Sequence, residues 1–372
     1  MTEKAEKWRL LEDWRRLVPA AGGLAVDDLL AYSISDFGSP PILHLYTFEP
    51  AAIVGKYQDI HAALKLDRCR ERGVAFNRRS TGGGTVIMGP DVVALGFGIS
   101  LRDKRIGSGV GGVFRVMSGV LVRALERLGV SASFRPKNDL EVAGKKLAGL
   151  SASAEVGDCV LFHASILVDF DVNLMLDIMN TPAQKIYDKG YSCFSERLTT
   201  IRKETHRDVT MDEAIHAIRS SFEESFGIRF VQSELTPPER EKAADLEKGR
   251  YCDEHWIFSH RHPPSNMGEA LVKTPGGLLQ VYLSTAGHAI DQVIITGDFF
   301  STTEQLNRLE SALKWTLAEP DRILQAIREV WEPDLIYGVS PEALRDAIVA
   351  AKTVCDKAQG PPYSDRAPHG RA

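Results

Sequence analysis

The sequence reads RRSTGGGTV at residues 78–86, and the rest of the chain can be interpreted outward from this stretch. Gly82, Gly83 and Gly84 lack side chains, so their backbone can approach a ligand closely and point amide N–H groups at an anion. Arg79 and the arginine before it offer planar charged groups suited to phosphate or carboxylate. The stretch matches neither the phosphate loop that ends in Gly-Lys-Ser/Thr nor the dinucleotide G-x-G-x-x-G motif. We therefore expect an anion-binding loop here; a flexible surface turn with solvated arginines is the alternative.

A second polar segment reads KNDL at residues 137–140, at the start of an expected strand. Asp139 is suited to Mg²⁺, which prefers carboxylate and phosphate oxygens. Asn138 is suited to hydrogen-bond an adenine or a phosphate oxygen. The alternative is an ordinary Asn-Asp turn after Pro136.

A third segment reads GKKLAGLS at residues 144–151. A strand lysine followed by small residues can direct its ammonium into a cleft, where a fixed cation neutralises charge that develops on an acyl phosphate. Lys145 and Lys146 should face opposite sides of the strand, so one of them should face solvent. A hairpin turn with two exposed lysines is the alternative.

A single histidine, His163, lies inside the apolar stretch FHASIL at residues 162–167. Such a histidine is more often structural than catalytic. The five cysteines are widely spaced and form no C-x-x-C, which argues against a disulfide framework or a zinc knuckle. Neither Cys159 nor Cys193 has a close histidine partner in the sequence, so each is expected to be a small buried residue.

The composition is that of an ordinary globular protein, with 44% apolar residues, 26% charged residues and a formal net charge of −5. Nothing in this balance calls for a nucleic acid or an anionic membrane as partner. Residues 1–16 contain no apolar signal region, and no apolar run approaches the roughly 20 residues that span a bilayer. We expect a cytoplasmic protein and a monomer.

The length of 372 residues suggests about two domains. Strands are expected at 42–46, 52–54, 74–77, 85–88, 139–142, 145–152 and 160–168, and helices at 113–128, 173–179 and 211–226. The last of these begins with the capping-box pattern of Thr210 and Glu213. Proline pairs around a charged segment indicate a linker, followed by a three-stranded meander and three helices. We expect a catalytic domain at 1–235, a linker at 236–264, a second domain at 265–355 and a disordered tail at 356–372.

In this order and at these spacings, the four segments resemble the lipoate–protein ligase family, part of the biotin ligase and octanoyltransferase superfamily. The resemblance begins with LHLY at 43–46 and IVGKYQD at 53–59, and it continues through the segments quoted above. It extends to the meander and the closing helices, which look like the family's small C-terminal accessory domain. It implies an α+β class: a mixed-sheet biotin/lipoate ligase-like catalytic domain followed by a small α+β accessory domain.

The resemblance also implies an activity, in which ATP and Mg²⁺ convert lipoate or octanoate to an acyl-adenylate. The acyl group then passes to a lysine of a lipoyl carrier domain or an H-protein-like carrier. Lys146 corresponds to the catalytic lysine, and Asn138 and Asp139 would face the nucleotide and Mg²⁺. The residues that it places along the substrate and nucleotide channel are Arg79, Thr81, Gly82, Gly83, Gly84, Gln58, Gly149, Ser151 and His163.

Three departures from the family pattern bear on this reading. Gly89-Pro90 stands where many members have His-Asp, and Leu150 stands where a small residue is common, which would narrow the acyl channel. Octanoyltransferase branches use a cysteine nucleophile, but 131–140 and 180–189 contain no cysteine and Cys193 is the nearest candidate. Residues 190–200 resemble the loop that helps to cover the bound adenylate.

Three alternatives to the ligase stay open at this point. The chain could be a transferase that moves octanoate or lipoate between carriers without ATP. It could be a non-catalytic protein that binds lipoyl-AMP, or a ligase for biotin.

Overall fold

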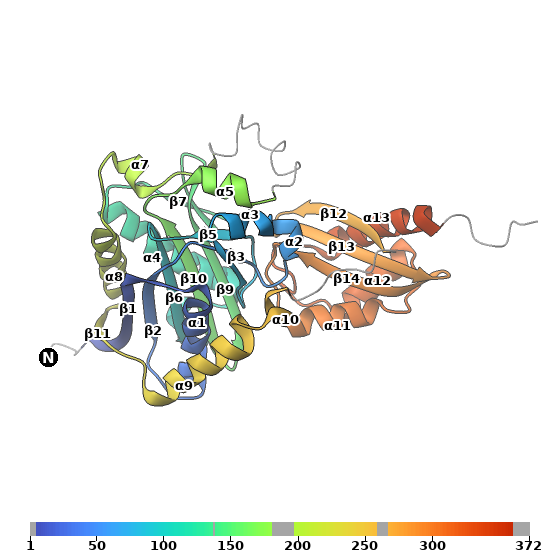
Figure 1. The fold of residues 1–372 in the computed structure, drawn as a ribbon. Coiled ribbons are helices and arrows are strands. Elements are labelled where there is room, and N and C mark those ends of the chain that lie inside the picture. Colours follow the sequence, from blue (N-terminus) through green and yellow to red (C-terminus); the bar gives the residue numbers. More distant parts are fainter. Residues whose placement is uncertain (1–4, 137, 181–196, 259–266, 360–372) are drawn as a thin grey trace, which may run out of the picture. The chain divides into compact units, whose positions relative to one another are not determined.

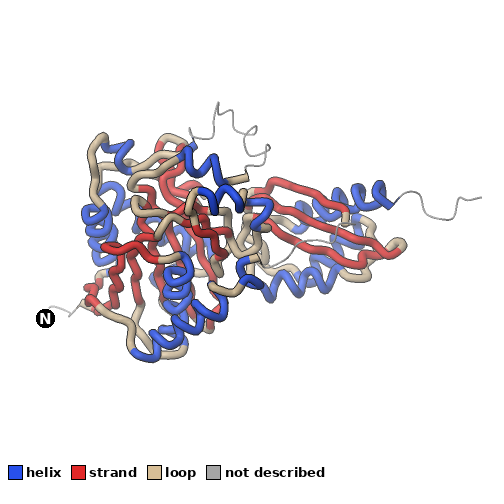
Figure 2. Tube along the Cα trace, in the orientation of Figure 1, coloured by secondary structure: helices blue, strands red, loops and turns tan. Residues whose placement is uncertain are grey.

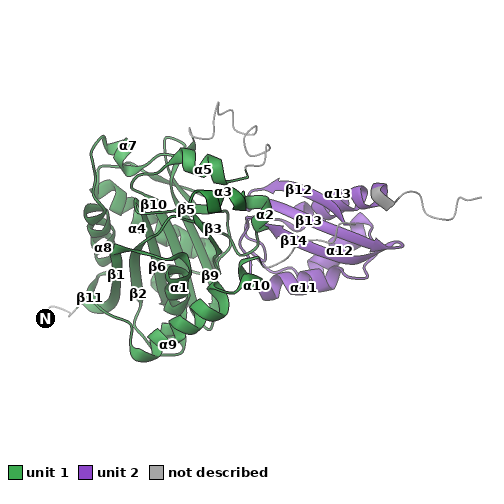
Figure 3. Ribbon diagram, viewed as in Figure 1, with its two compact units in different colours: residues 1–259 green, residues 260–372 purple. Residues whose placement is uncertain are grey.

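The computed structural model describes residues 5–136, 138–180, 197–258 and 267–359. The chain forms two compact units, residues 1–259 and 260–372 (Figure 3). No helix in the described ranges is both long and apolar enough to cross a membrane.

The first unit is built on a mixed eight-stranded sheet with the order β11-β1-β2-β6-β10-β9-β8-β7 (Figure 1). β1 pairs in parallel with β11 and with β2, and the other neighbours are antiparallel. The bounds are β1 Glu6–Val18, β2 Ile42–Phe48, β6 Val92–Ser100, β7 Ser133–Arg135, β8 Asp139–Val142, β9 Lys145–Val156, β10 Cys159–Leu167 and β11 Ile228–Gln232. The expected α+β class with a mixed sheet is confirmed.

A second, small sheet has the order β4-β3-β5, from β3 Ala51–Val54, β4 Ala75–Arg78 and β5 Val86–Met88. The RRSTGGG stretch connects β4 to β5. Helices flank the strands (Figure 2). Their bounds are α1 Ala20–Ser35, α2 Ile60–Ala63, α3 Leu66–Glu71, α4 Gly109–Arg127, α5 Val172–Ile178, α7 Ile201–Thr205, α8 Met211–Phe226, α9 Pro237–Leu246 and α10 Glu254–Ile257.

Strand β6 lies at the centre of the large sheet, and helices pack on both faces of that sheet. Phe97 points toward α8, where its ring centroid lies 5.3 Å from that of Phe222. Gly96 and Gly98 alternate with Phe97 and therefore face the other side. A Cβ on Gly96 would lie 2.2 Å from an oxygen of Asp27, and one on Gly98 would lie 2.8 Å from the carbonyl oxygen of Leu30. Helix α1 therefore packs closely on β6, where the two glycines leave room for Asp27 and Leu30.

The capping box predicted for the helix at 211–226 is confirmed. Glu213 N–H bonds the hydroxyl of Thr210 at 3.2 Å, and the carboxylate of Glu213 accepts from Thr210 N–H at 2.8 Å. Gly227, with φ 65°, ends α8 in the left-handed region where glycine carries no steric penalty.

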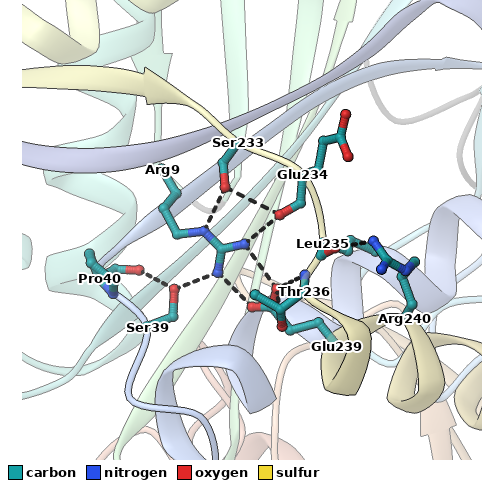
Figure 4. A network of polar contacts seen from close by, with 9 residues as sticks. All are labelled: Arg9, Ser39, Pro40, Ser233, Glu234, Leu235, Thr236, Glu239 and Arg240. Atoms are coloured by element: carbon teal, nitrogen blue, oxygen red, sulfur yellow. Dashed lines mark hydrogen bonds and ion pairs between the residues drawn. The ribbon is translucent and has the colours of Figure 1, made fainter.

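Arg9 of β1 fastens α9 to the sheet (Figure 4). Its guanidinium donates to both carboxylate oxygens of Glu239, at 2.6 and 2.9 Å, and to the hydroxyls of Ser39 and Ser233, at 2.9 and 3.0 Å. Glu239 also accepts from the N–H of Thr236 at 2.8 Å, which caps the start of α9. Burial alone would raise the pKa of Glu239, but these donors hold it at about 2.

The expected linker at 236–264 needs correction. Residues 237–246 form α9, 247–251 form a π-helical turn and 254–257 form α10. Leu246 and Tyr251 are buried in the cluster that also contains Leu24 and Tyr46. This segment therefore belongs to the first unit, and its prolines mark the start of a helix rather than a flexible connection. Residues 259–264 lie outside the described residues.

The second unit contains the expected meander and helices. β12 Gly268–Thr274, β13 Gly277–Ala286 and β14 Ala289–Gly297 form an antiparallel sheet. α11 Thr303–Leu313, α12 Pro320–Val330 and α13 Pro341–Gln359 follow it. The helix α13 continues through 356–359, where a disordered tail was expected, and residues 360–372 lie outside the described residues.

We predict that Arg9→Ala lowers the free energy of unfolding by about 3 kcal/mol, because it leaves the carboxylate of Glu239 buried without its cation. Urea denaturation followed by tryptophan fluorescence measures this change. Arg102→Ala is the control: it removes an exposed ion pair with Asp158 and should cost less than about 1 kcal/mol. Equal effects of the two substitutions would contradict a structural role for the Arg9–Glu239 contact.

Candidate active site

The strand register places a row of small and polar residues across one face of the large sheet. Residues directly opposite each other on neighbouring strands share a face. One row crosses six strands and consists of Tyr46, Ala94, Ser165, Gly149, Asp139 and Arg135. A second row, two residues away, consists of His44, Gly96, His163 and Ser151. This face therefore brings together residues from segments that are far apart in the sequence.

A pocket of about 600 Å³, including its open mouth, lies over these rows. Helix α1, the small sheet and the glycine stretch supply its other walls. Its apolar lining includes Leu24, Phe48, Ile53, Val86 and Met88. Of the site residues expected from the sequence, those that line it are Arg79, Gly84, Asn138, Lys146, Gly149, Ser151 and His163. The other expected site residues do not line the pocket but lie directly behind residues that do. They are Gln58, Thr81, Gly82, Gly83 and Asp139.

A shift in strand register directs Lys146 toward the pocket. Asp139 pairs with Gly149 and Leu140 with Ala148, but the next residue, Glu141, pairs with Lys146 and skips Leu147. Regular alternation would put Lys146 on the face opposite Gly149, and the extra residue reverses this. Nζ of Lys146 lies 2.9 Å from the place that a Cβ on Gly149 would occupy. Lys145, by contrast, is exposed.

The carboxylate of Asp139 is held between two cations. Its Oδ1 lies 2.8 Å from Nζ of Lys146, and Arg135 pairs with its other oxygen. Burial alone would raise the pKa of Asp139, but Lys146 and Arg135 hold it at about 2. Arg135 was not anticipated from the sequence, although it lies only four residues before Asp139.

The expectation that Asp139 holds Mg²⁺ stays a prediction. Each of its oxygens contacts one cation, and an ionised carboxylate has further lone pairs that could reach a metal ion. In the described ranges, no three His, Cys, Asp or Glu side chains gather as metal ligands. In this structure the carboxylate of Asp139 contacts the ammonium of Lys146.

The two arginines of the glycine stretch bind backbone carbonyl groups rather than facing open space. Arg79 donates to the carbonyls of Gly82 and Gly84, at 2.6 and 2.8 Å, and to the hydroxyl of Thr81 at 3.1 Å. Arg78 donates to the carbonyls of Gly55, Lys56 and Gln58 and to that of Trp256. Burial lowers the pKa of Arg78 to about 10. Both guanidinium groups hold the loop in shape, and Arg79 also lines the pocket. That Arg79 binds phosphate or carboxylate stays a prediction.

A tight turn at Gly55 supports the glycine stretch from behind. A Cβ on Gly55 would lie 1.9 Å from the carbonyl oxygen of Gly83, so no side chain fits there. The side-chain oxygen of Gln58 accepts from Gly55 N–H at 2.9 Å and from the hydroxyl of Thr85 at 3.1 Å. Gln58 therefore lies behind the glycine stretch, and a role in binding substrate or nucleotide stays a prediction. Ser151 bonds the carbonyl of Gly82 at 3.0 Å and ties the same loop to the large sheet.

A buried polar network, which was not anticipated from the sequence, forms another wall of the pocket. Asp27 of α1 accepts from the hydroxyl of Tyr46 at 2.7 Å, and its other oxygen lies 3.0 Å from Nδ1 of His44. Nε2 of His163 lies 3.2 Å from Asp27, and Nδ1 of His163 lies 3.3 Å from the hydroxyl of Thr81. Because both ring nitrogens of His163 face partners, this residue is a structural link between α1 and the glycine stretch.

The two histidines of this network differ in their pKa. Burial lowers the pKa of His163, so its ring is neutral at neutral pH. Burial acts on His44 in the same direction, but its ring lies between Asp13 and Asp27, and hydrogen bonds to both raise its pKa above the ordinary value.

Two expectations about other residues can now be compared with the structure. Leu150 lines the pocket together with its neighbours Gly149 and Ser151. That it narrows the acyl channel stays a prediction. None of the four cysteines that the structure describes lines the pocket. Cys193 and most of the loop expected to cover an adenylate, 190–196, lie outside the described residues.

Comparison with known proteins identifies the family of this arrangement. The model of the lipoyl protein ligase A/B catalytic domain matches residues 19–223. The chain belongs to this family. The match spans the glycine stretch, Lys146 and His163, and it includes α1 with Asp27.

Curated relatives of this lipoyl protein ligase A/B family member have two kinds of name. The octanoyltransferase LipM of Brevibacillus brevis is 26% identical, over 66% of this chain and 99% of the relative. Subunit 1 of lipoate-protein ligase A from Thermoplasma acidophilum is 29% identical, over 63% of this chain and 90% of the relative.

Solved structures of lipoate ligases share the fold of this family member. A bipartite lipoate protein ligase from Thermoplasma acidophilum, studied with its E2 lipoyl domain, is 26% identical with a TM-score of 0.60, over 70% of this chain and 99% of that one. Lipoate-protein ligase A bound with ATP is 25% identical with a TM-score of 0.57, over 69% and 99%. LipL1 of P. falciparum in complex with lipoate, 17% identical with a TM-score of 0.69, matches 92% of this chain and 99% of its own, and it shares the fold.

We predict that Gly55→Ala weakens binding of a lipoyl-type acid at least tenfold, because the new methyl group collides with the backbone of Gly83. Calorimetric titration with octanoate measures the affinity. Gly89→Ala is the matched control, since a Cβ there meets nothing within 4 Å. Unchanged affinity in Gly55→Ala would show that the turn does not shape the pocket.

We also predict a pH-dependent contribution of His44 to stability. Its pKa is raised on folding, so its stabilisation is complete below the unfolded value of about 6.5 and is lost as the pH rises through the folded pKa. His44→Gln should therefore cost about 3 kcal/mol near pH 6 and progressively less at higher pH. Urea denaturation of both proteins across this range tests it, and a difference that does not change with pH would contradict the prediction.

Proposed function

We propose that this chain places a lipoyl or octanoyl group on the lysine of a carrier domain. The observation that carries the proposal is an apolar pocket of acyl-chain size with the ammonium of Lys146 held in its wall by Asp139. The names of the relatives agree with this reaction, and the Thermoplasma ligase was studied with a lipoyl domain as its partner. That the protein acts as a monomer stays a prediction.

The chemical task is to join a carboxyl carbon to an amine. A free carboxylate resists attack, so the acyl group has to arrive activated, either as an adenylate or as a thioester. In both cases negative charge develops on oxygen when the carrier's amine attacks, and a fixed ammonium in a site that excludes water stabilises it. We assign this role to Lys146. In the adenylate case Gly84 and Asn138, which also line the pocket, would contact the nucleotide.

The relatives favour direct transfer between carriers. LipM of Brevibacillus brevis matches this chain over nearly all of its own length, and so does LipM of Bacillus subtilis, at 25% identity. In this route the carrier's amine replaces the thiol of an octanoyl or lipoyl thioester, an amide forms and the thiol leaves. No ATP is consumed. A cysteine intermediate, if there is one, would have to come from residues that the structure does not describe.

Two observations favour the ATP-dependent route instead. The described lining of the pocket contains no thiol. The match to LipM also covers only 66% of this chain. The resemblance described above places an accessory domain in the ligases, and this chain has a second unit. In this route the acid attacks the α-phosphate of ATP, pyrophosphate leaves, and the carrier's amine then displaces AMP from the acyl-adenylate. A related ligase has been seen with ATP bound.

The two routes are distinguished by offering the purified protein two donors in parallel. One reaction contains an octanoyl thioester on an acyl carrier, and the other contains octanoate or lipoate with MgATP. Each includes an unmodified lipoyl carrier domain, and intact mass reports its acylation. Product from the thioester alone supports direct transfer, and product that requires ATP, with release of pyrophosphate, supports the ligase. Acylation from neither donor, with a panel of carriers, would refute the proposed function.

We predict that Lys146→Ala lowers the rate of carrier acylation by about 10²–10³-fold, the typical effect of removing one charge-stabilising group. Lys145→Ala removes the neighbouring, exposed lysine and should change the rate less than twofold. Single-turnover acylation followed by mass spectrometry gives both rates. A variant Lys146→Ala with normal turnover would remove Lys146 from the mechanism.

A further inference from the structure

Two groups of opposite charge face the pocket from positions two strands apart. Nζ of Lys146 lies over Gly149 of β9, and the carboxylate of Asp27 lies over Gly96 of β6. Strand β10 runs between them. Two strand spacings amount to about 10 Å, and Gly149 and Gly96 belong to the two different rows, two residues apart along the strands. The separation is comparable to the length of an extended eight-carbon acid.

Asp27 presents a negative charge on this side of the pocket. Three groups converge on its two oxygens: His44 on Oδ1, and Tyr46 and His163 on Oδ2. The hydroxyl of Tyr46 donates to Oδ2, and His44 and His163 lie within 3.2 Å of the carboxylate, so its oxygens face polar groups.

The lining between the two charges is mainly apolar and includes Phe48, Ile53 and Met88. A ligand with one carboxylate can place it beside Lys146 and leave its other end uncharged near Asp27. A second carboxylate at that end would lose its water and meet a like charge. Such an arrangement is unfavourable in a site of low dielectric constant.

We propose that Asp27 determines substrate specificity by orienting a monocarboxylic acid with its carboxyl group at Lys146 and excluding acids that carry a second carboxylate at the far end. This inference rests on the proposed function, because it requires that the pocket binds a medium-chain acid. It adds two points to the proposed function: the pocket accepts monocarboxylic acids, and Asp27 is the residue that disfavours acids with a second carboxylate.

The first test uses the unmodified full chain and three acids of equal chain length. Octanoate, octanedioate and the monomethyl ester of octanedioate are titrated by calorimetry. Octanoate and the monomethyl ester should bind, and octanedioate should bind at least tenfold more weakly. Because the ester is bulkier than the free acid but uncharged at its far end, it separates charge from size. Exclusion of the ester together with octanedioate would overturn the inference in favour of a steric limit.

The second test compares two substitutions on the same helix. Asp27→Asn should reduce the preference for octanoate over octanedioate to less than threefold. Asp28→Asn is the matched control: Asp28 is equally buried, but it bonds Arg250 at 2.5 Å and does not line the pocket. It should leave the preference unchanged. If Asp27→Asn does not fold, Asp27→Ser serves in its place, and equal binding of octanoate and octanedioate by the unmodified protein still overturns the inference.

The outcomes separate this inference from the proposed function. If the unmodified protein binds octanoate and octanedioate equally, the role of Asp27 is refuted while the proposed function stands. If it binds none of the acids and acylates no carrier, the proposed function fails and the inference falls with it. Retention of the full preference by Asp27→Asn refutes the inference alone.

Discussion

The close approach of α1 to strand β6 is the constraint on which the first unit depends. Only glycine at 96 and 98 leaves room for the helix, because any Cβ there would overlap Asp27 or the backbone at Leu30. This contact carries a carboxylate down to the level of the sheet, where it meets side chains from β2 and β10. The pocket is the space that remains beside the helix. The close approach of α1 to β6 therefore determines both the depth of the pocket and the polarity of its lining.

Most charged residues of the site bond other charged residues or backbone carbonyl groups. Arg78 and Arg79 bond carbonyl groups, Asp139 is paired by Lys146 and Arg135, and Asp27 is surrounded by donors. A buried charge without partners would be costly, so each has a defined set of contacts. Such a site is preorganised, since its dipoles and charges are in place before a substrate arrives.

Much of the architecture was predictable from the sequence, and the reasons are local. The helix that begins at Thr210 carries its own capping signals, and the meander of the second unit follows from alternating apolar residues and glycine turns. The glycine stretch, Asn138 and Lys146 were found because they form compact motifs. The α1 helix and strand β6 were missed, although the first holds Asp27 and the second lies at the centre of the sheet. Asp27 becomes a pocket residue only through contacts with His44 and His163, which lie 17 and more residues away.

The roles of the arginines and of Asp139 could not be read from spacing either. A sequence shows that cations and carboxylates are close along the chain, but it does not show which of them will neutralise each other. The linker at 236–264 was misread for a related reason. Its charged composition suggested solvent, whereas Glu239 finds a buried partner in Arg9, which lies 230 residues earlier.

The skipped residue in β9, Leu147, determines which of two lysines faces the pocket. Two lysines stand in tandem, and the irregular pairing at Leu147 selects the second of them. If the strand paired regularly, Leu147 would lie opposite Glu141, and Lys146 would pass to the other face of the sheet. The ammonium at the site therefore depends on this one irregularity in the strand as much as on the lysine itself, and an insertion or deletion in the hairpin would remove it without changing residue 146.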